Sequence, residues 1–175
     1  MFSNSNIQLA VLEDATSIQD LLNKSYRGET SKKGWTTEAF LIDGEIRVNE
    51  QMVLEVMNQS NSVFLKYVNL ENKIVGCVNL QKHNSKVYLG MFSVKPELQG
   101  VGLGKEILKV SEEYAFSINC NSIYMSVISL RTELINWYKR NGYVETGEIK
   151  SFDEDGITGK HLQKLEFIIL EKQIA

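Results

Sequence analysis

The sequence has few of the residues that mark disulfide-rich and metal-binding proteins. Its 175 residues include one proline, two cysteines and two histidines, and the cysteines form no CxxC pair. Cys77 and Cys120 each adjoin an apolar run, which predicts reduced, structural residues. His83 and His161 stand alone in polar stretches, so no metal site is expected.

Concentrated charge and long apolar runs are also missing. The net charge is −3 and no basic run is longer than Lys32-Lys33, which argues against DNA or RNA as the main partner. No apolar run approaches the roughly 20 residues that cross a membrane. The N-terminus lacks the basic region and apolar core of a signal peptide. We therefore expect a cytoplasmic protein with no membrane partner.

What is present suits one globular domain. Hydrophobic residues make up 43% of the chain, enough to fill a sizeable core. No repeat, low-complexity tract or linker marks a second domain, so residues 1–175 are predicted to form a single one. A weakly periodic loop at about 28–48 interrupts it, and loops of this length are usually functional.

The most informative stretch is Ser93–Lys105, SVKPELQGVGLGK. A strand-like run, Val87–Phe92, precedes it, and an apolar stripe at helical spacing follows: Leu103, Ile107, Val110 and Tyr114. A strand therefore turns through three glycines into the start of a helix. Free N–H groups and the helix dipole make such a helix start a natural site for a phosphate or pyrophosphate.

Spacing excludes two of the three known loops of this kind. A Walker P-loop requires Ser or Thr after its Gly-Lys pair, where Glu106 stands, and an earlier glycine, where Gln99 stands. A dinucleotide fingerprint requires Gly or Ala at its sixth position. Lys105 or Ile107 stands there, depending on the glycine from which the count starts.

The spacing that fits is Gln-x-x-Gly-x-Gly, formed by Gln99, Gly102 and Gly104 and preceded by Val94-x-Pro96. This pattern resembles the acetyl-CoA pyrophosphate loop of the GCN5-related N-acetyltransferase (GNAT) superfamily. A second segment, Asn136–Tyr143, is similar to the Tyr-x-x-x-Gly-Phe/Tyr signature of the same family. The two segments occur in the expected order.

The resemblance implies an α/β (α+β) fold: a mixed, mostly antiparallel central sheet of about seven strands, flanked by about four helices. Periodicity predicts strands near 7–12, 63–70, 73–80, 87–92, 123–128, 143–149 and 162–170. It predicts helices from Asp14, from Asn49, from Leu103 and over about 130–141, with one helical turn at 34–41 capped by Thr36 or Thr37.

The resemblance also implies a reaction and a site. Acetyl-CoA is the expected cosubstrate, and its acetyl group passes to a primary amine of a small molecule or protein by direct attack and a tetrahedral intermediate. Tyr138 matches the catalytic tyrosine, expected to assist the leaving thiolate; the alternative is a tyrosine packed on the cofactor wall, with Trp137 in the core. The expected cofactor contacts are Phe92, Ser93, Val94, Gln99, Gly100, Val101, Gly102, Leu103, Gly104 and Lys105.

The acceptor side is less defined. Trp35 and Glu38 in the long loop are candidate substrate contacts, with Trp35 alternatively anchoring the loop. The strand Leu89–Val94 carries no carboxylate, so the strand glutamate of some GNAT enzymes is absent. Acidic residues in or just after the loop can relay a proton and favour a cationic amine such as a polyamine, unless they are only solvated surface charges. They are Glu38, Asp43, Glu45 and Glu50.

Two questions stay open at this point. Arg131 is expected to pair with Glu133 or another neighbour, with a cofactor contact as the alternative. Because no base is identified, a noncatalytic acyl-CoA-binding or regulatory module on the same fold is the alternative function. A homodimer is compatible with either function.

Overall fold

The computed structural model describes residues 1–174. The strands are β1 (Ile7–Leu9), β2 (Ile42–Asp43), β3 (Ser62–Val68), β4 (Ile74–His83), β5 (Lys86–Val94), β6 (Ser122–Ile128), β7 (Val144–Phe152), β8 (Lys160–His161) and β9 (Leu165–Gln173). The helices are α1 (Ala15–Tyr26), α2 (Gly28–Ser31), α3 (Glu50–Met57), α4 (Leu103–Ser117) and α5 (Thr132–Arg140). Two short 3-10 turns are η1 (Leu12–Asp14) and η2 (Pro96–Leu98).

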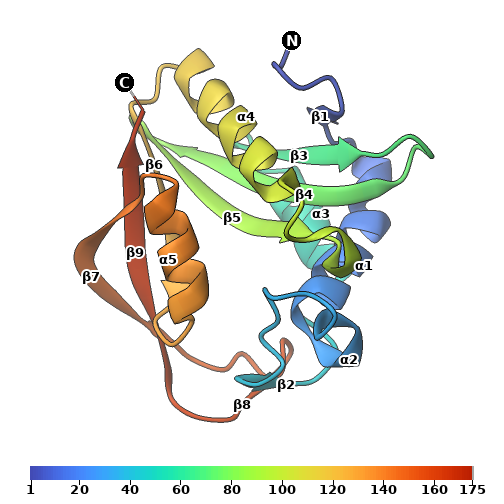
Figure 1. Cartoon of the computed structure of the whole chain (residues 1–175), viewed down its shortest axis with the longest axis vertical. Coiled ribbons are helices and arrows are strands. Elements are labelled where there is room, and N and C mark those ends of the chain that lie inside the picture. Colours follow the sequence, from blue (N-terminus) through green and yellow to red (C-terminus); the bar gives the residue numbers. More distant parts are fainter. Residues whose placement is uncertain (175) are drawn as a thin grey trace.

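Seven strands form one sheet in the order β1-β3-β4-β5-β6-β9-β7 (Figure 1). Only β5 and β6 run parallel, and the other neighbours in this sheet are antiparallel. The predicted mixed, mostly antiparallel sheet of seven strands is confirmed. A separate pair, β2 with β8, ties the long loop to the segment between β7 and β9. No helix within residues 1–174 combines the length and apolarity needed to span a membrane.

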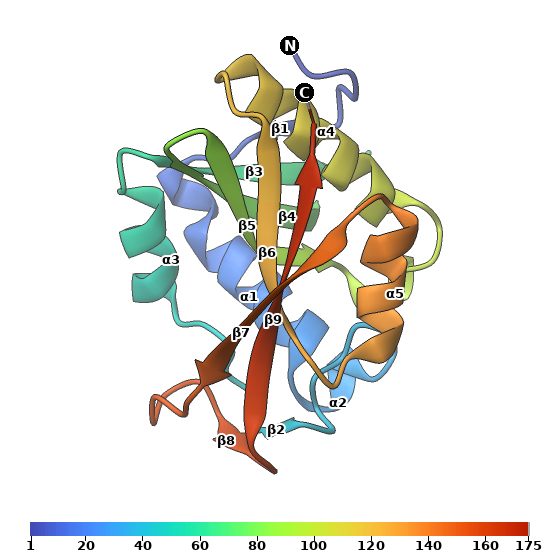
Figure 2. The same cartoon turned by 90° about the vertical axis from the view of Figure 1, so that its left-hand side faces the viewer.

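Helices cover both faces of the sheet. α1 and α3 lie on one face, and α4 and α5 lie on the other (Figures 1 and 2). The apolar stripe of α4 explains its position, because Ile107 and Val110 are fully buried against the sheet as the helical spacing predicts. The opposite face buries a second cluster around Ile18, Leu22 and Val53. The core is therefore split into two layers by the sheet.

Two predicted helix caps have different outcomes. Asn49 caps α3 as predicted, since its side chain accepts a hydrogen bond from the Met52 amide at 2.9 Å. Asp14 stands before α1, but its side chain accepts from the Val11 amide and from Lys66 Nζ instead of capping the helix. The carboxylate therefore secures the preceding turn to β3.

The long loop contains one predicted turn and one that was not predicted. A single helical turn overlaps the predicted one at 34–41, since the Glu38 carbonyl accepts from the Leu41 and Ile42 amides, and Thr37, one of the two expected caps, accepts from the Ala39 amide through Oγ1. The short helix α2, at Gly28–Ser31, was not predicted. The other expected cap, Thr36, instead accepts from the Gln99 side chain, and Thr37 Oγ1 also bonds with Ser31. These contacts use the two hydroxyls to fold the loop back on itself and on residue 99.

Candidate active site

The strands β5 and β6 pair over three residues and then separate (Figure 1). Beyond Tyr88, β5 bulges: its register with β4 shifts between Cys77 and Asn79, and Met91 has a φ of 45°. A bulge adds a residue to one strand and bends it. The bend turns β5 away from β6 and creates the gap in which the site lies.

The glycine loop after β5 presents free backbone amides. Gly100 and Gly102 have φ values of +81° and +99°, and a Cβ added at either would meet no atom within 4 Å. Within residues 1–174, the amides of residues 100–105 donate no backbone hydrogen bond, whereas the Glu106 amide donates to the Gly102 carbonyl. An open row of N–H groups at the start of a 15-residue helix has the geometry of an anion site.

A cleft of about 530 Å³ lies along this loop. Eight of the ten predicted cofactor contacts line it: Phe92, Ser93, Val94, Gln99, Gly100, Gly102, Gly104 and Lys105. The side chain of Val101 is instead 70% exposed, and Leu103 packs against the core. The Ser93 hydroxyl is buried and has no hydrogen-bond partner among the described residues.

The side chain of Gln99 is used within the protein. Its Oε1 accepts from the amides of Trp35 (2.9 Å) and Thr36 (3.3 Å), and its Nε2 donates to Thr36 Oγ1 (2.8 Å) and the Val94 carbonyl (2.9 Å). Both lone pairs and both N–H groups of the amide are therefore occupied. Gln99 ties the long loop to the end of β5, and only its backbone remains for a cofactor.

Trp35 and Trp137 form one wall of the same cleft. Their ring centroids lie 6.0 Å apart, and Trp137 also contacts Phe92 at 6.2 Å. The alternative for Tyr138 placed Trp137 in the core. Trp137 is half-buried: it packs against the core cluster and also lines the cleft. Trp35 lines this cleft and lies outside the smaller cavity described below, which supports its role as a loop anchor.

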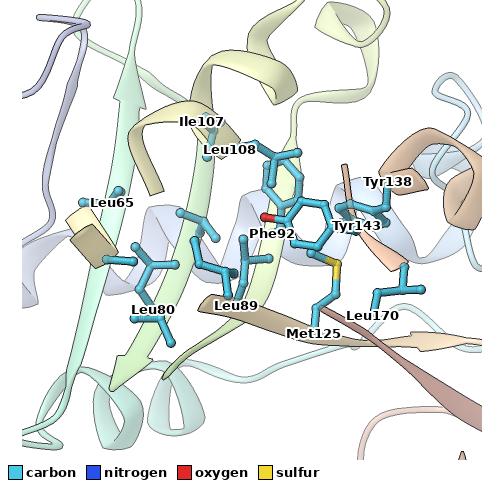
Figure 3. Close-up of a cluster of buried hydrophobic side chains, with 14 of the residues drawn as sticks. Leu65, Leu80, Leu89, Phe92, Ile107, Leu108, Met125, Tyr138, Tyr143 and Leu170 are labelled. Carbon is cyan, nitrogen blue, oxygen red and sulfur yellow. The ribbon is translucent and has the colours of Figure 1, made fainter. Parts of the chain in front are cut away.

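Tyr138 lies where α5 meets the sheet. It is 4% exposed and contacts the rings of Phe92 and Tyr143, at centroid distances of 6.4 and 5.7 Å (Figure 3). Burial raises the pKa of the Tyr138 hydroxyl well above its ordinary value of 10.0. The side chain is therefore a neutral phenol, able to donate a hydrogen bond at any working pH.

A second cavity, of about 120 Å³, opens between β5, β6 and the long loop. Glu38, Arg47 and Arg131 are the charged residues in its lining, and the remainder is mostly apolar. The cleft and this cavity share four lining residues: Tyr26, Phe92, Leu134 and Tyr138. The two spaces therefore lie next to each other at the tyrosine predicted to be catalytic.

Glu38 is the centre of a buried ion cluster. Its side chain pairs with Arg27 through Oε2 and with Arg131 Nη1 through Oε1 at 3.1 Å, and Arg47 Nε lies 4.0 Å from Oε2. Burial alone would raise the pKa of the Glu38 carboxyl, but the guanidinium groups of Arg131, Arg47 and Arg27 outweigh it and hold that pKa below its ordinary value. Glu38 is thus a committed counter-ion and a weak base.

Arg131 is therefore placed differently from the expected pairing with Glu133. Besides Glu38 it donates to the Thr36 carbonyl, so it joins the start of α5 to the long loop. The other acidic candidates, Asp43, Glu45 and Glu50, are exposed and lie outside both cavity linings.

Three residues of the site carry no sequence signal. The Tyr26 hydroxyl donates a hydrogen bond to the Phe92 carbonyl, beside the bulge of β5. The Arg47 guanidinium lies over the Tyr26 ring, 4.2 Å from its centroid, and Arg27 is buried beneath Glu38. Only their position in the sequence could have drawn attention to Arg27 and Arg47, because they lie at the two ends of the long loop that was expected to be functional.

A splayed mixed sheet with a glycine loop at the start of α4 is the architecture of a GNAT acetyltransferase domain. The profile of the Acetyltransferase (GNAT) family matches residues 16–143, and the chain belongs to this family. It is 30% identical over 88 residues to an uncharacterised N-acetyltransferase of Methanocaldococcus jannaschii. The matched residues cover 50% of this chain and 56% of that protein.

Another relative and a solved structure extend the comparison. A spermine/spermidine N(1)-acetyltransferase of Bacillus subtilis is 31% identical over 80 residues, covering 45% of this chain and 52% of that protein. The chain thus spans about half the length of the curated relatives it matches. The ribosomal-protein-S18-alanine N-acetyltransferase of Escherichia coli shares the fold, with a TM-score of 0.72, 13% identity and coverage of 97% of this chain and 93% of that chain.

Proposed function

We propose that the chain is an N-acetyltransferase that moves the acetyl group of acetyl-CoA to a primary amine of a small molecule or protein. One observation carries the proposal: Phe92 and Tyr138 line both the large cleft and the small cavity. A thioester in the cleft and an amine in the cavity would therefore both lie beside these two residues. Such an arrangement holds two reactants close together in a productive orientation.

The cleft fits acetyl-CoA in three respects. The free amides of residues 100–105 suit its pyrophosphate. Phe92, Ser93 and Val94 line the part of the cleft that we propose for the pantetheine arm. A main-chain N–H of the bulged strand is our candidate for the donor that stabilises the oxyanion, a contribution of about 3 to 4 kcal/mol where such donors have been removed.

Tyr138 is our candidate for assisting the leaving group. The amine nitrogen bonds to the thioester carbon, the C–S bond of the tetrahedral intermediate breaks, and the departing sulfur accepts a hydrogen bond from the phenol. A free thiol has a pKa of about 8.5. Burial raises the pKa of Tyr138 above 10.0, so full proton transfer from the phenol to the thiolate is uphill. The transfer is completed when the nitrogen that has attacked the carbonyl loses its extra proton and so restores the proton of the tyrosine. Glu38, with its lowered pKa, is not the base in this scheme.

A thiol-release assay at saturating acetyl-CoA tests the proposal, together with calorimetry of acetyl-CoA binding. The acceptor panel contains spermidine, because the Bacillus subtilis relative is named for polyamines, with free amino acids and short peptides. We expect saturable binding and turnover on at least one amine. Binding with no turnover would favour the noncatalytic module, and absence of binding would overturn both functions.

A further inference from the structure

Arg47 differs from the other two arginines of the ion cluster. Arg27 and Arg131 donate hydrogen bonds to Glu38 and to backbone carbonyls. The Arg47 Nη1 atom is buried within the described structure without any hydrogen-bond partner, and its Nε lies 4.0 Å from Glu38. Its side chain is 24% exposed and lines the small cavity. A guanidinium with uncommitted donors therefore faces the space proposed for the acceptor.

The charge of this cavity is positive. Three guanidinium groups share one carboxylate, and both oxygens of that carboxylate are already engaged. The other side chains of the lining carry no charge, with residues such as Leu89, Met125 and Val127 covering its walls. Buried charge without a partner is costly, so a second anion beside Arg47 would be stabilised there. A polyamine would instead bring further positive charge into the same space.

The position of Arg47 limits how far this anion lies from the reacting nitrogen. The guanidinium stacks on the Tyr26 ring, and the Tyr26 hydroxyl bonds to the Phe92 carbonyl at the junction of the two cavities. One tyrosine side chain therefore separates Arg47 from the place of attack. The cavity of about 120 Å³ leaves room for only a small group between them.

We propose that the acceptor is a small amine that also carries a carboxylate a few bonds from its nitrogen, as in an amino acid, and that Arg47 binds this carboxylate. The inference rests on the proposed acetyl transfer and names its substrate class. A planar guanidinium matches a carboxylate with two parallel hydrogen bonds, which suits Arg47 better than a lysine. The expectation of a cationic acceptor counted Glu38 as a free charge, whereas its three arginine partners reverse the local sign.

Matched acceptors test the proposal. Each free L-amino acid is compared with its carboxamide, which keeps the amine and side chain and removes the negative charge, and spermidine is added as a polycation. At saturating acetyl-CoA we expect kcat/KM for the best amino acid to exceed that for its carboxamide by about 10- to 100-fold, the value of a charged hydrogen-bonded pair. An equal or greater kcat/KM for the carboxamides or for spermidine would overturn the inference.

The variant Arg47→Gln locates the effect. We expect it to lower the ratio between amino acid and carboxamide toward one, with Arg47→Lys intermediate because it keeps the charge without the fork. Lys73→Gln is the control, since Lys73 is an exposed cation that pairs with Glu71, and it should leave the ratio unchanged. If Arg47→Gln slows both acceptors equally, Arg47 is structural and the inference fails.

A binding measurement separates this inference from the proposed reaction. Melting temperature is recorded for the wild type and Arg47→Gln with coenzyme A and each amino acid or carboxamide of the panel. We expect at least one amino acid to stabilise the wild type and not the variant, and its carboxamide to stabilise neither. Such stabilisation without turnover would refute the proposed acetyl transfer and support the anion site. Turnover of amines without carboxylate-dependent stabilisation would support the acetyl transfer and refute the anion site.

Discussion

The cofactor cleft and the acceptor cavity are built by different means. The cleft presents free main-chain amides, those of residues 100–105, beside side chains such as Trp35 and Trp137. The cavity presents side chains, in Arg47, Arg131 and Glu38, which come from two separate stretches of the chain. Free backbone amides suit an anion such as a phosphate. Recognition by side chains depends on which residues the fold brings together. The first is local to one loop, and the second depends on the tertiary structure.

This difference bears on how each region fails when it is altered. A change in the glycine loop affects a surface turn with open space around it. A change in the ion cluster affects charges that are buried and mutually dependent. We therefore expect substitutions in the cavity to cost stability first, and substitutions in the cleft to cost binding or turnover first.

The largest expected effect is on the free energy of unfolding of Glu38→Gln. The substitution leaves Arg27, Arg47 and Arg131 without their shared counter-ion, and breaking a buried pair in this way costs about 3–5 kcal/mol. Urea denaturation measures it. Glu71→Gln is the matched control, because that carboxylate pairs with exposed Lys73 at the surface, and its midpoint should not move. Equal midpoints for the two variants would contradict a structural role for the cluster.

The same cluster predicts the sign of a pH effect. The pKa of Glu38 is lower in the folded chain than its ordinary value of 4.5, so the unfolded chain takes up the proton first as the pH falls. The contribution of Glu38 to stability is therefore complete above about pH 5 and is lost as the pH falls through the folded pKa. The difference in unfolding free energy between wild type and Glu38→Gln should be flat from neutral pH to about pH 5 and shrink below it. A difference that grows on acidification would refute this sign.

Tyr138→Phe is the next largest change and affects the junction of the two regions. Removing the phenol takes away the donor to the leaving sulfur, so we expect turnover to fall about 10- to 1,000-fold while acetyl-CoA affinity changes little. Stopped-flow or steady-state thiol release measures the first, and calorimetry the second. Tyr143→Phe is the control, because the Tyr143 hydroxyl is buried without a hydrogen-bond partner and lines neither cavity. Unchanged turnover in Tyr138→Phe would remove it from the mechanism.

The cofactor cleft and the acceptor cavity also differ in how well the sequence predicted them. The strands, the stripe of α4 and the glycine loop were predicted from short runs of sequence, because each depends on neighbours along the chain. The seven-stranded mixed sheet joins distant segments and was expected from the family resemblance. The ion cluster was not, because it joins Arg27, Glu38, Arg47 and Arg131 across more than 100 positions. A carboxylate seen alone in sequence indicates negative charge, and only the fold shows which cations cancel it.

Gln99 shows the limit within the motif itself. The spacing Gln-x-x-Gly-x-Gly located the loop, but it did not reveal that the glutamine side chain bonds to residues 35 and 36 and to the Val94 carbonyl. The bulge at Met91 was missed for a related reason. Met91 adopts its φ of 45° although it is not a glycine, so no residue type in the sequence marks the bulge.

The glycine loop offers a smaller and more specific test. Gly102→Ala places a Cβ on a residue with a φ of +99°, which costs about 1–3 kcal/mol of strain and obstructs the amides beside it. Gly147→Ala is the control, since Gly147 has a φ of +87° and equally open surroundings far from the cleft. We expect similar losses of stability in the two variants, but acetyl-CoA binding about 10-fold weaker or more in Gly102→Ala alone. Equal affinities would refute backbone recognition of the coenzyme.

The smallest expected effect is that of Tyr26→Phe, which tests whether the two regions are coupled. The variant keeps the ring on which Arg47 stacks and removes only the hydrogen bond to the Phe92 carbonyl, at a cost of about 1 kcal/mol in unfolding free energy. If that bond positions the bulged strand, turnover should fall by less than tenfold for every acceptor, because the carboxylate site is intact. If Tyr26 acted only through Arg47, the fall would appear for amino acids and not for their carboxamides. The ratio of the two rates in Tyr26→Phe therefore shows whether the hydroxyl serves the strand that both cavities share or the acceptor cavity alone.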